Sequence, residues 1–373
     1  MTELIKADSF ADLLRNRTAL LDVRSPVEFQ RGALPTATNI PLLTDPQRQR
    51  IGTCYRQQGR EAAIALGYEL VDEIARESLL HQWREFIAQN SSAALYCWRG
   101  GLRSSTVQQW LADHGIHIPR IDGGFKALRH FLLETITDLA SGENLVIVAG
   151  KTGSGKTHFI NDLGNSLDLE GLANHRGSAF GKRVVPQPAQ IDFENALGVD
   201  LLHLDWSDHR RVVLEDESRA IGSLSIPLEL HQRMLQSPIA MLEETLQQRI
   251  DTIHLDYIQS NYQDFRNSAP EQAEELFAES LTDALFRIRK RLGLERYQRI
   301  SLILEDALRQ QRNGQGIDAH RNWIEELLTD YYDPMYEYQL QKKSSRIVFR
   351  GNREETRRWI QSVTGERAQG EQI

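Results

Sequence analysis

A cysteine and two arginines stand close together in the segment 97–103, which reads CWRGGLR. A cysteine thiolate is a strong nucleophile, and neighbouring arginines favour it over the thiol because they add fixed positive charge. The Cys-x5-Arg spacing is typical of a loop that holds an anion above a nucleophile. We therefore predict that Cys97 is a catalytic nucleophile and that Arg99 and Arg103 bind an anion beside it. An inert cysteine at the end of a buried strand is the alternative.

The segments on either side of Cys97 predict the elements that position it. Residues 93–96 form a short apolar run typical of a buried strand, and residues 104–114 predict a helix. A cysteine between a strand end and a helix N-terminus meets main-chain amides and the positive end of the helix dipole. Gly100 and Gly101 allow the loop to curl so that several amides face an anion. These surroundings favour the functional interpretation of Cys97.

A second group of residues that could do chemistry is the segment 150–157, which reads GKTGSGKT. It matches the phosphate-binding pattern G-x-x-x-x-G-K-T, and the apolar run 145–149 before it predicts the buried strand that this pattern requires. The glycines let main-chain amides approach phosphate oxygens, the lysine reaches the outer phosphate, and the threonine hydroxyl faces Mg²⁺. The pattern predicts diphosphate binding without identifying the rest of the ligand. The predicted phosphate-binding residues are Gly150, Gly153, Ser154, Gly155, Lys156 and Thr157.

Carboxylates that could complete a magnesium site occur in the segment 211–219. Its apolar start predicts the second strand of a phosphate-loop domain, and carboxylates at the end of that strand can hold the water shell of the metal. Glu215 and Asp216, together with Thr157, are the candidates, and we expect no tightly bound metal. A solvated acidic strand end is the alternative for each carboxylate.

Basic residues in the second half of the chain could contact phosphate or RNA. The segment 174–183 is basic and contains glycine, and a second basic stretch occupies residues 342–358. A solvated surface of mixed charge is the alternative in both places. The predicted contacts are His175, Arg176, Lys182, Arg183, Arg346 and Arg350.

The composition is that of a globular protein with no disulfide framework. The chain has 373 residues, 40% hydrophobic and 26% charged, with a formal net charge of −8 that argues against non-specific nucleic-acid binding. Its two cysteines, Cys54 and Cys97, indicate a reducing compartment where a thiolate survives. We expect Cys54 to be structural or incidental. No signal peptide or membrane span is evident, so we expect a cytoplasmic protein.

The pattern of apolar residues predicts an α/β fold with two domains. Short apolar runs alternate with helical patterns, which indicates parallel sheets flanked by helices. A break at residues 141–144 predicts a boundary between a domain of residues 1–140 and a phosphate-loop domain of residues 141–373 with a helical, basic C-terminal extension. The longer predicted helices cover residues 44–59, 60–89, 240–265, 271–292, 294–311 and 318–332.

Four motifs within residues 11–140 resemble the rhodanese family. They are DVR at 22–24 with EF at 28–29, the turn-rich segment 32–41, the loop 97–103, and DGGF at 122–125. In that family the loop cysteine carries a transferable chalcogen atom, which the resemblance implies for Cys97. The loop is one residue longer than is usual in sulfurtransferase members, and Cys-x5-Arg is the spacing of the related phosphatase branch. The longer loop admits a larger tetrahedral anion and points to a phosphorus-containing donor.

The order of motifs along the whole chain is similar to that of the tRNA 2-selenouridine synthase family. HRGS at 175–178, EDESR at 215–219 and YYDPMY at 331–336 follow the phosphate loop. The resemblance implies a transferase that converts the wobble 2-thiouridine of tRNA to 2-selenouridine through S-geranyl-2-thiouridine. It implies geranyl diphosphate and selenophosphate as co-substrates and Cys97 as a selenium-carrying nucleophile, while the phosphate loop itself predicts Mg²⁺.

Two other classes of function stay open from the residues. The Cys-x5-Arg loop also suits phosphoester hydrolysis, so a phosphatase would release phosphate from a generic aryl phosphate. The phosphate loop also suits a nucleotide-driven kinase or switch in which the rhodanese-like part binds a partner. Such a protein would bind and turn over ATP or GTP independently of tRNA.

Overall fold

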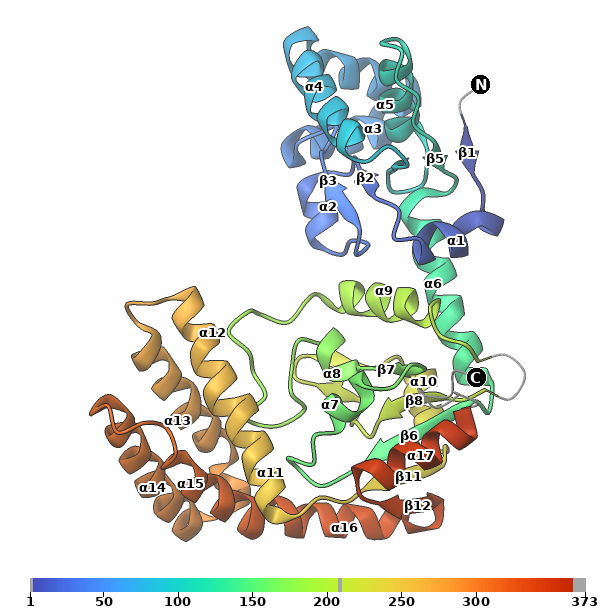
Figure 1. Ribbon diagram of the computed structural model, residues 1–373. Coiled ribbons are helices and arrows are strands. Elements are labelled where there is room, and N and C mark those ends of the chain that lie inside the picture. The colour runs from blue at the N-terminus through green and yellow to red at the C-terminus, as the bar shows by residue number, and fades with distance from the viewer. Residues whose placement is uncertain (1–2, 207–209, 365–373) are drawn as a thin grey trace. The chain divides into compact units, whose positions relative to one another are not determined.

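The computed structural model describes residues 3–206 and 210–364, which form two compact units (Figure 1). The first unit comprises Met1–Thr137 together with Ala189–His203, and the second comprises Asp138–Pro188 together with Leu204–Ile373. The sequence placed a boundary at residue 140. It gave no sign that residues 189–203, which follow the phosphate loop in the chain, belong with the first unit.

The first unit contains a five-stranded sheet whose neighbouring strands are all parallel. In the order of the sheet, its strands are β1 (Leu4–Ile5), β5 (Arg120–Ile121), β4 (Ala94–Tyr96), β2 (Leu20–Asp22) and β3 (Ala37–Asn39). The register pairs Asp22 with Tyr96, so the segments that follow β2 and β4 leave the sheet at the same edge. That edge therefore brings the DVR motif and the cysteine loop together.

Helices cover this sheet and form its buried core. Trp83 of α4 and Val107 of α5 are fully buried on one side, and Phe125 of α6 is nearly so on the other. A break at Gly59, with φ +87°, interrupts α3, and α4 begins after Asp72 caps it, so the predicted helix 60–89 is two helices. The helices are α1 (Phe10–Arg15), α2 (Pro26–Gln30), α3 (Asp45–Leu70), α4 (Glu73–Gln89), α5 (Leu102–Ala112), α6 (Gly124–Ser141) and α9 (Gln190–Leu201).

The segment 189–203 packs into the first unit through α9. The main-chain amide of Ala33 donates to Asp192, and Asn195 donates back to the Ala33 carbonyl at 2.7 Å. Arg129 of α6 donates to Asn195 at 3.0 Å and forms an ion pair with Glu194. These polar contacts join residues far apart in the sequence, which is why local patterns did not reveal them.

The second unit contains a parallel sheet with the phosphate-loop strand at its centre. In the order of the sheet, its strands are β12 (Ile347–Gly351), β11 (Ile239–Leu242), β6 (Leu145–Ala149), β8 (Val212–Glu215) and β7 (Ser166–Leu167). A hairpin of β9 (Ala220–Ile221) and β10 (Leu224–Ser225) stands apart from it. Outside the helical extension, the helices are α7 (Lys156–Asn161), α8 (Leu169–Leu172), α10 (Leu228–Met234) and α17 (Arg353–Thr364).

The predicted helix 240–265 was wrong at its start. Ile239–Leu242 is a strand that pairs with both β6 and β12, and all four of its residues are buried. A short apolar run buried on both faces has no periodicity that separates strand from helix. The helical part begins only at Leu246, after Thr245 caps it.

The rest of the second unit is a helical extension with its own core. Phe277 and Trp323 are buried at its centre, and α13, α14 and α15 lie side by side (Figure 1). No helix within the described residues is long and apolar enough to cross a membrane. The extension consists of α11 (Leu246–Ile253), the π-helix His254–Ser260, α12 (Asn261–Ser268), α13 (Ala273–Leu292), α14 (Leu294–Arg312), α15 (His320–Leu327), the π-helix Leu328–Tyr332 and α16 (Asp333–Lys343).

Candidate active sites

Cys97 lies directly after β4, at the floor of the loop that leads into α5. Its Sγ is 3.2 Å from the hydroxyl oxygen of Ser104 and 4.0 Å from the carbonyl oxygen of Gly101. Only 3% of the residue is exposed, so the sulfur lies at the floor of the loop. The predicted place of Cys97 between a strand and a helix is confirmed.

The DGGF motif holds the cysteine loop in shape. The amides of Phe125 and Lys126 donate to the carbonyls of Cys97 and Trp98, at 2.9 and 3.0 Å. Gly124 has φ +58°, and a Cβ there would lie 2.3 Å from the Cys97 carbonyl oxygen. Only glycine allows this close approach. Two motifs that are 25 residues apart in the sequence therefore form one loop structure.

The loop has free main-chain donors where an anion could bind. Within residues 3–206, the amides from Trp98 to Arg103 donate no hydrogen bond to another protein group. Leu102 and Arg103 begin α5, where a helix leaves its first amides without an intrahelical partner. Unpaired amides at a helix N-terminus favour a negatively charged ligand. The arrangement fits a tetrahedral anion above Cys97.

Arg103 is held in a buried ion pair with Glu28 of α2. Its guanidinium donates two hydrogen bonds to the Glu28 carboxylate, the longer at 3.1 Å. Burial alone would raise the pKa of Glu28, but the hydrogen bond and charge of Arg103 outweigh it and hold the pKa at about 2. Although burial opposes it, the partnership with Glu28 raises the pKa of Arg103, and the negative charge of Cys97 adds to this effect. Arg103 therefore stays charged beside the sulfur.

A hollow of about 370 Å³ adjoins the loop. Trp98, 38% exposed, stacks on Phe125 with ring centroids 5.5 Å apart, and Arg24 lies 3.9 Å over the Phe125 ring. Arg24 is fully buried in an ion pair with Asp22, yet its Nη1 has no hydrogen-bond partner among the described residues. Ile191 of α9 also lines the hollow. Arg24 and Trp98 were not predicted as site residues, and only their place in the DVR and loop motifs could have indicated a role.

Arg99 is exposed and lines a second, more open hollow of about 640 Å³. Arg48, Arg56 and Arg103 line it as well, together with Tyr55 of α3. The entrance to the cysteine loop is therefore strongly basic. Cys54 lies on α3 and is a free thiol, as is Cys97, so the two cysteines form no disulfide.

In the second unit, the phosphate loop joins β6 to α7 as the sequence predicted. Gly153 and Gly155 have φ of +83° and +70°, which only glycine adopts without strain. The Lys156 ammonium donates to the Gly150 carbonyl at 3.1 Å. The Ser154 hydroxyl is buried and has no hydrogen-bond partner among the described residues. A phosphate oxygen would satisfy this hydroxyl and attract Lys156.

Carboxylates surround the Thr157 hydroxyl, which donates to Glu170 at 2.9 Å and lies 3.3 Å from Glu215. Burial raises the pKa of Glu215, and the charges of Glu170 and Glu217 raise it further. Asp216 does not share this position, because Lys343 binds its carboxylate at 2.6 Å. Of the two predicted carboxylates, Glu215 reaches Thr157, and the sequence missed Glu170.

These residues fit a magnesium ion of the kind that phosphate loops bind. A cation would lower the electrostatic repulsion between these buried carboxylates, and the Thr157 hydroxyl would be one of its ligands. Within the described ranges, no cluster of three or more histidine, cysteine or acidic side chains could hold a metal by protein ligands alone. Mg²⁺ commonly keeps several waters and takes one or two carboxylates plus substrate phosphates. Thr157 with Glu215 and Glu170 would serve this role.

A buried arginine braces the phosphate loop from α11. Arg249, 3% exposed, donates to the Thr152 carbonyl at 2.9 Å and binds Asp333 of α16 at 2.6 Å. Lys151 of the loop also reaches α16, at 2.8 Å from Glu337. The YYDPMY segment therefore supports the phosphate loop through Asp333.

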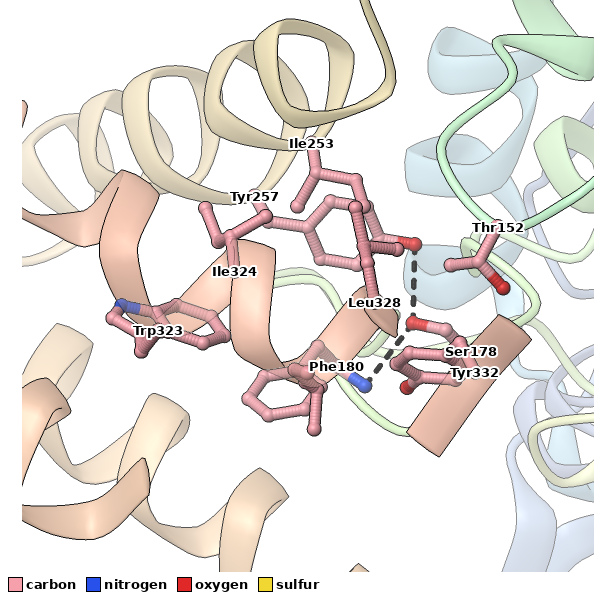
Figure 2. Close-up of a pocket in the computed structure, with 10 residues that line it drawn as sticks. Thr152, Ser178, Phe180, Ile253, Tyr257, Trp323, Ile324, Leu328 and Tyr332 are labelled. Carbon is pink, nitrogen blue, oxygen red and sulfur yellow. Dashed lines mark hydrogen bonds between the residues drawn. The ribbon is translucent and has the colours of Figure 1, made fainter. Parts of the chain in front are cut away.

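The HRGS loop forms one wall of an apolar pocket beside the phosphate loop (Figure 2). The Ser178 hydroxyl contacts the Tyr257 hydroxyl at 3.1 Å and accepts from the Phe180 amide, and Thr152 of the phosphate loop lines the same pocket. The pocket encloses about 20 Å³, so a long chain enters only if lining side chains turn aside. The apolar lining comes mainly from the helical extension: Ile253, Trp323, Ile324, Leu327 and Leu328.

The predicted RNA contacts lie in different settings of the second unit. Arg176 packs over the ring of Tyr257 and faces Ser260 and Asn261, whereas Lys182 is exposed. Arg346 donates to the carbonyls of Met234 and Ser237, both at 3.0 Å, and so holds the end of α10.

Burial lowers the pKa of His175, and the charge of Arg183 lowers it further. Arg350, half exposed, reaches Glu243 at 3.3 Å. Their contact with RNA stays a prediction.

Comparison with known proteins matches both units. The family model for the tRNA 2-selenouridine synthase AAA domain matches residues 143–367, and the rhodanese-like domain model matches residues 6–130. A tRNA 2-selenouridine synthase from Azotobacter vinelandii is 49% identical over 94% of this chain and 96% of its own. Proteins of that name from Pseudomonas savastanoi and Photobacterium profundum are 48% and 46% identical, over 93% and 94% of this chain and 96% of each of theirs.

Proposed function

Because the chain belongs to the tRNA 2-selenouridine synthase family, we propose that it is an enzyme that replaces the sulfur of wobble 2-thiouridine in tRNA with selenium. The observation that carries the proposal is the pairing of an anion-binding cysteine loop with a phosphate loop in one chain. A phosphatase or a nucleotide-driven switch would need only one of the two. The name of the relatives supplies the substrate that both sites would share.

The route proceeds through two transfers. Thiouridine sulfur is a poor leaving group until it is alkylated. The sulfur first attacks the C1 carbon of geranyl diphosphate, diphosphate leaves, and S-geranyl-2-thiouridine forms. Selenium from selenophosphate then takes the place of the sulfur at C2, and geranyl thiol leaves. No oxidant or reductant is required, because each step exchanges one nucleophile for another.

The second unit suits the geranyl transfer. The amides of the phosphate loop, Lys156 and the unpaired Ser154 hydroxyl would bind the diphosphate. Mg²⁺ at Thr157 would stabilise the charge that develops on the leaving diphosphate. The apolar pocket reached through Thr152 would take part of the geranyl chain.

The first unit suits the selenium transfer. Free amides above Cys97, with Arg103 and Arg99 beside them, would bind selenophosphate as a tetrahedral anion. Cys97 would act on that anion as a nucleophile. A pocket of about 80 Å³, lined by Ile64, Trp110 and the loop residue Leu102, would take part of the chain of the departing geranyl thiol.

The experiment that tests this function is mass spectrometry of nucleosides from thiolated tRNA incubated with the protein. With geranyl diphosphate alone we expect S-geranyl-2-thiouridine, and with selenophosphate added we expect 2-selenouridine. Omission of geranyl diphosphate should stop selenium incorporation. Selenouridine formed at an unchanged rate without geranyl diphosphate would contradict the two-step route.

A further inference from the structure

Selenophosphate can react with a cysteine at two atoms, and the two reactions differ in their electron balance. Selenium in selenophosphate is in the selenide state, bound to phosphorus(V). Attack of a thiolate on selenium would leave the bonding electrons on phosphorus and release phosphite, or would need an external oxidant. Attack on phosphorus releases hydrogen selenide and forms an S–P bond with no change of oxidation state.

We propose that Cys97 takes the phosphoryl group of selenophosphate, so that selenium leaves as hydrogen selenide. Ser104 then donates a proton to the Cys97 sulfur when the phosphoryl group is released. This inference rests on the proposed use of selenophosphate, and it replaces the role of selenium carrier that the family resemblance implies for Cys97. The Cys97 sulfur attacks phosphorus, an S–P bond forms, and the P–Se bond breaks. Hydrogen selenide carries the electron pair away.

The selenide then completes the exchange on the base. It attacks C2 of S-geranyl-2-thiouridine, and geranyl thiol leaves with one of its protons while the other goes to the base. Water attacks the phosphorus of the cysteinyl phosphate and the S–P bond breaks. Phosphate is released and the Cys97 thiolate is regenerated. The sum is selenophosphate, water and S-geranyl-2-thiouridine giving phosphate, geranyl thiol and 2-selenouridine.

The loop geometry fits a phosphoryl group on Cys97. Three equatorial oxygens develop charge in such a transfer, and amides from Trp98 to Arg103 have no other acceptor among the described residues. Arg103 is held beside the sulfur by Glu28, which fixes its charge in place. A bare selenium atom on the sulfur would present no set of oxygens for these donors.

Ser104 is placed to help the sulfur leave. Its hydroxyl lies 3.2 Å from Sγ and 3.1 Å from the Gly101 carbonyl, so one proton can serve either acceptor. As the S–P bond breaks, negative charge grows on Sγ and draws that proton. The residue is fully buried, so water does not compete for the contact.

The test uses selenophosphate with radiolabelled phosphorus and the full-length protein, without tRNA or geranyl diphosphate. We expect label on the wild-type protein that turns over to phosphate, and hydrogen selenide released in equal amount. Ser104→Ala should lengthen the lifetime of the label roughly 100-fold, the effect of removing one donor to a developing charge. Ser104→Thr, which keeps the hydroxyl, should restore turnover.

Two controls make the result decisive. Ser105→Ala removes a neighbouring exposed hydroxyl that donates to Leu102, and it should leave the lifetime unchanged. The Cys97→Ser variant should show no phosphorus label that forms on the protein and is then released as phosphate. An adduct on Cys97 that contains selenium, lacks phosphorus and is removed by a thiol reductant would overturn the proposal. Because no RNA is present, this outcome is independent of whether the nucleoside experiment succeeds.

Discussion

At the scale of single residues, each site depends on charges that neighbouring groups hold in place. Glu28 fixes Arg103 beside Cys97, and Glu170 and Glu215 hold the Thr157 hydroxyl. In both places a buried acidic group orients a residue that would bind an anion or a metal. Removing Glu28 should therefore change the stability in a way that depends on pH. Removing Glu215 should change the activity in a way that depends on the Mg²⁺ concentration.

The Glu28–Arg103 pair predicts an acid-sensitive contribution to stability. The pKa of Glu28 falls from 4.5 to about 2 on folding, so its contribution is full above pH 4.5 and is lost as the pH falls towards 2. Glu28→Gln should lower the free energy of unfolding at pH 7 by about 2 kcal/mol. Urea denaturation at pH 7 and at pH 3 measures this. A difference between the two proteins that did not shrink at pH 3 would contradict the assignment.

The contacts of Thr157 predict that Glu215 contributes more to Mg²⁺ binding than Asp216 does. Glu215→Gln should raise the Mg²⁺ concentration needed for geranyl transfer by about 10- to 100-fold, because it removes a group that orients the metal. Asp216→Asn keeps its place beside Lys343 and should shift that concentration much less. Geranyl transfer measured over a range of Mg²⁺ concentrations decides between them. An equal shift in both variants would show that Glu215 has no special role.

At the scale of elements, α16 acts as a support for the phosphate loop. Arg249 is nearly fully buried and Asp333 is its carboxylate partner, so Asp333→Asn leaves a buried charge without compensation. We expect a loss of about 3 kcal/mol in the free energy of unfolding and a higher KM for geranyl diphosphate.

The matched control for Asp333 is Glu337→Gln on the same helix. Glu337 binds Lys151 at the surface, where an ion pair contributes less than about 1 kcal/mol. If the two variants had the same stability and the same KM, the support by α16 would be disproved.

The helical extension should lose stability in weak acid through His320 of α15. Burial lowers its pKa from 6.5 to about 4, and the charge of His254 adds to this. Folding therefore favours the neutral ring, and stability falls as the pH drops from 6.5 towards 4, by up to about 1.4 kcal/mol per pH unit. His320→Gln should flatten this dependence in urea denaturation at pH 7 and pH 5. An unchanged slope would assign the effect to another group.

The sequence predicted those elements whose signal is local. The phosphate loop, its strand Leu145–Ala149 and the strand before Cys97 follow from short motifs and apolar runs. The strand Ile239–Leu242 was missed because its burial comes from β6 and β12, which are distant in the sequence. Glu170 and Glu28 were missed as site residues for the same reason, since only folding brings them to Thr157 and Arg103.

At the scale of the whole molecule, we propose that each of the two units carries out one of the two transfers on the same base. The chain passes from the phosphate loop through the HRGS loop and then contributes α9 to the first unit. Ile191 of α9 lines the hollow beside Trp98. The first unit is therefore built from two separate stretches of the chain, and residues 1–137 expressed alone would lack part of the wall of this hollow.

The division of labour is tested most directly by nucleoside mass spectrometry on two variants, each with thiolated tRNA, geranyl diphosphate and selenophosphate. Cys97→Ser should accumulate S-geranyl-2-thiouridine and form no 2-selenouridine. Lys156→Ala should leave 2-thiouridine unmodified but convert tRNA that is already geranylated. Full selenium incorporation by Cys97→Ser, or undiminished geranyl transfer by Lys156→Ala, would contradict the account.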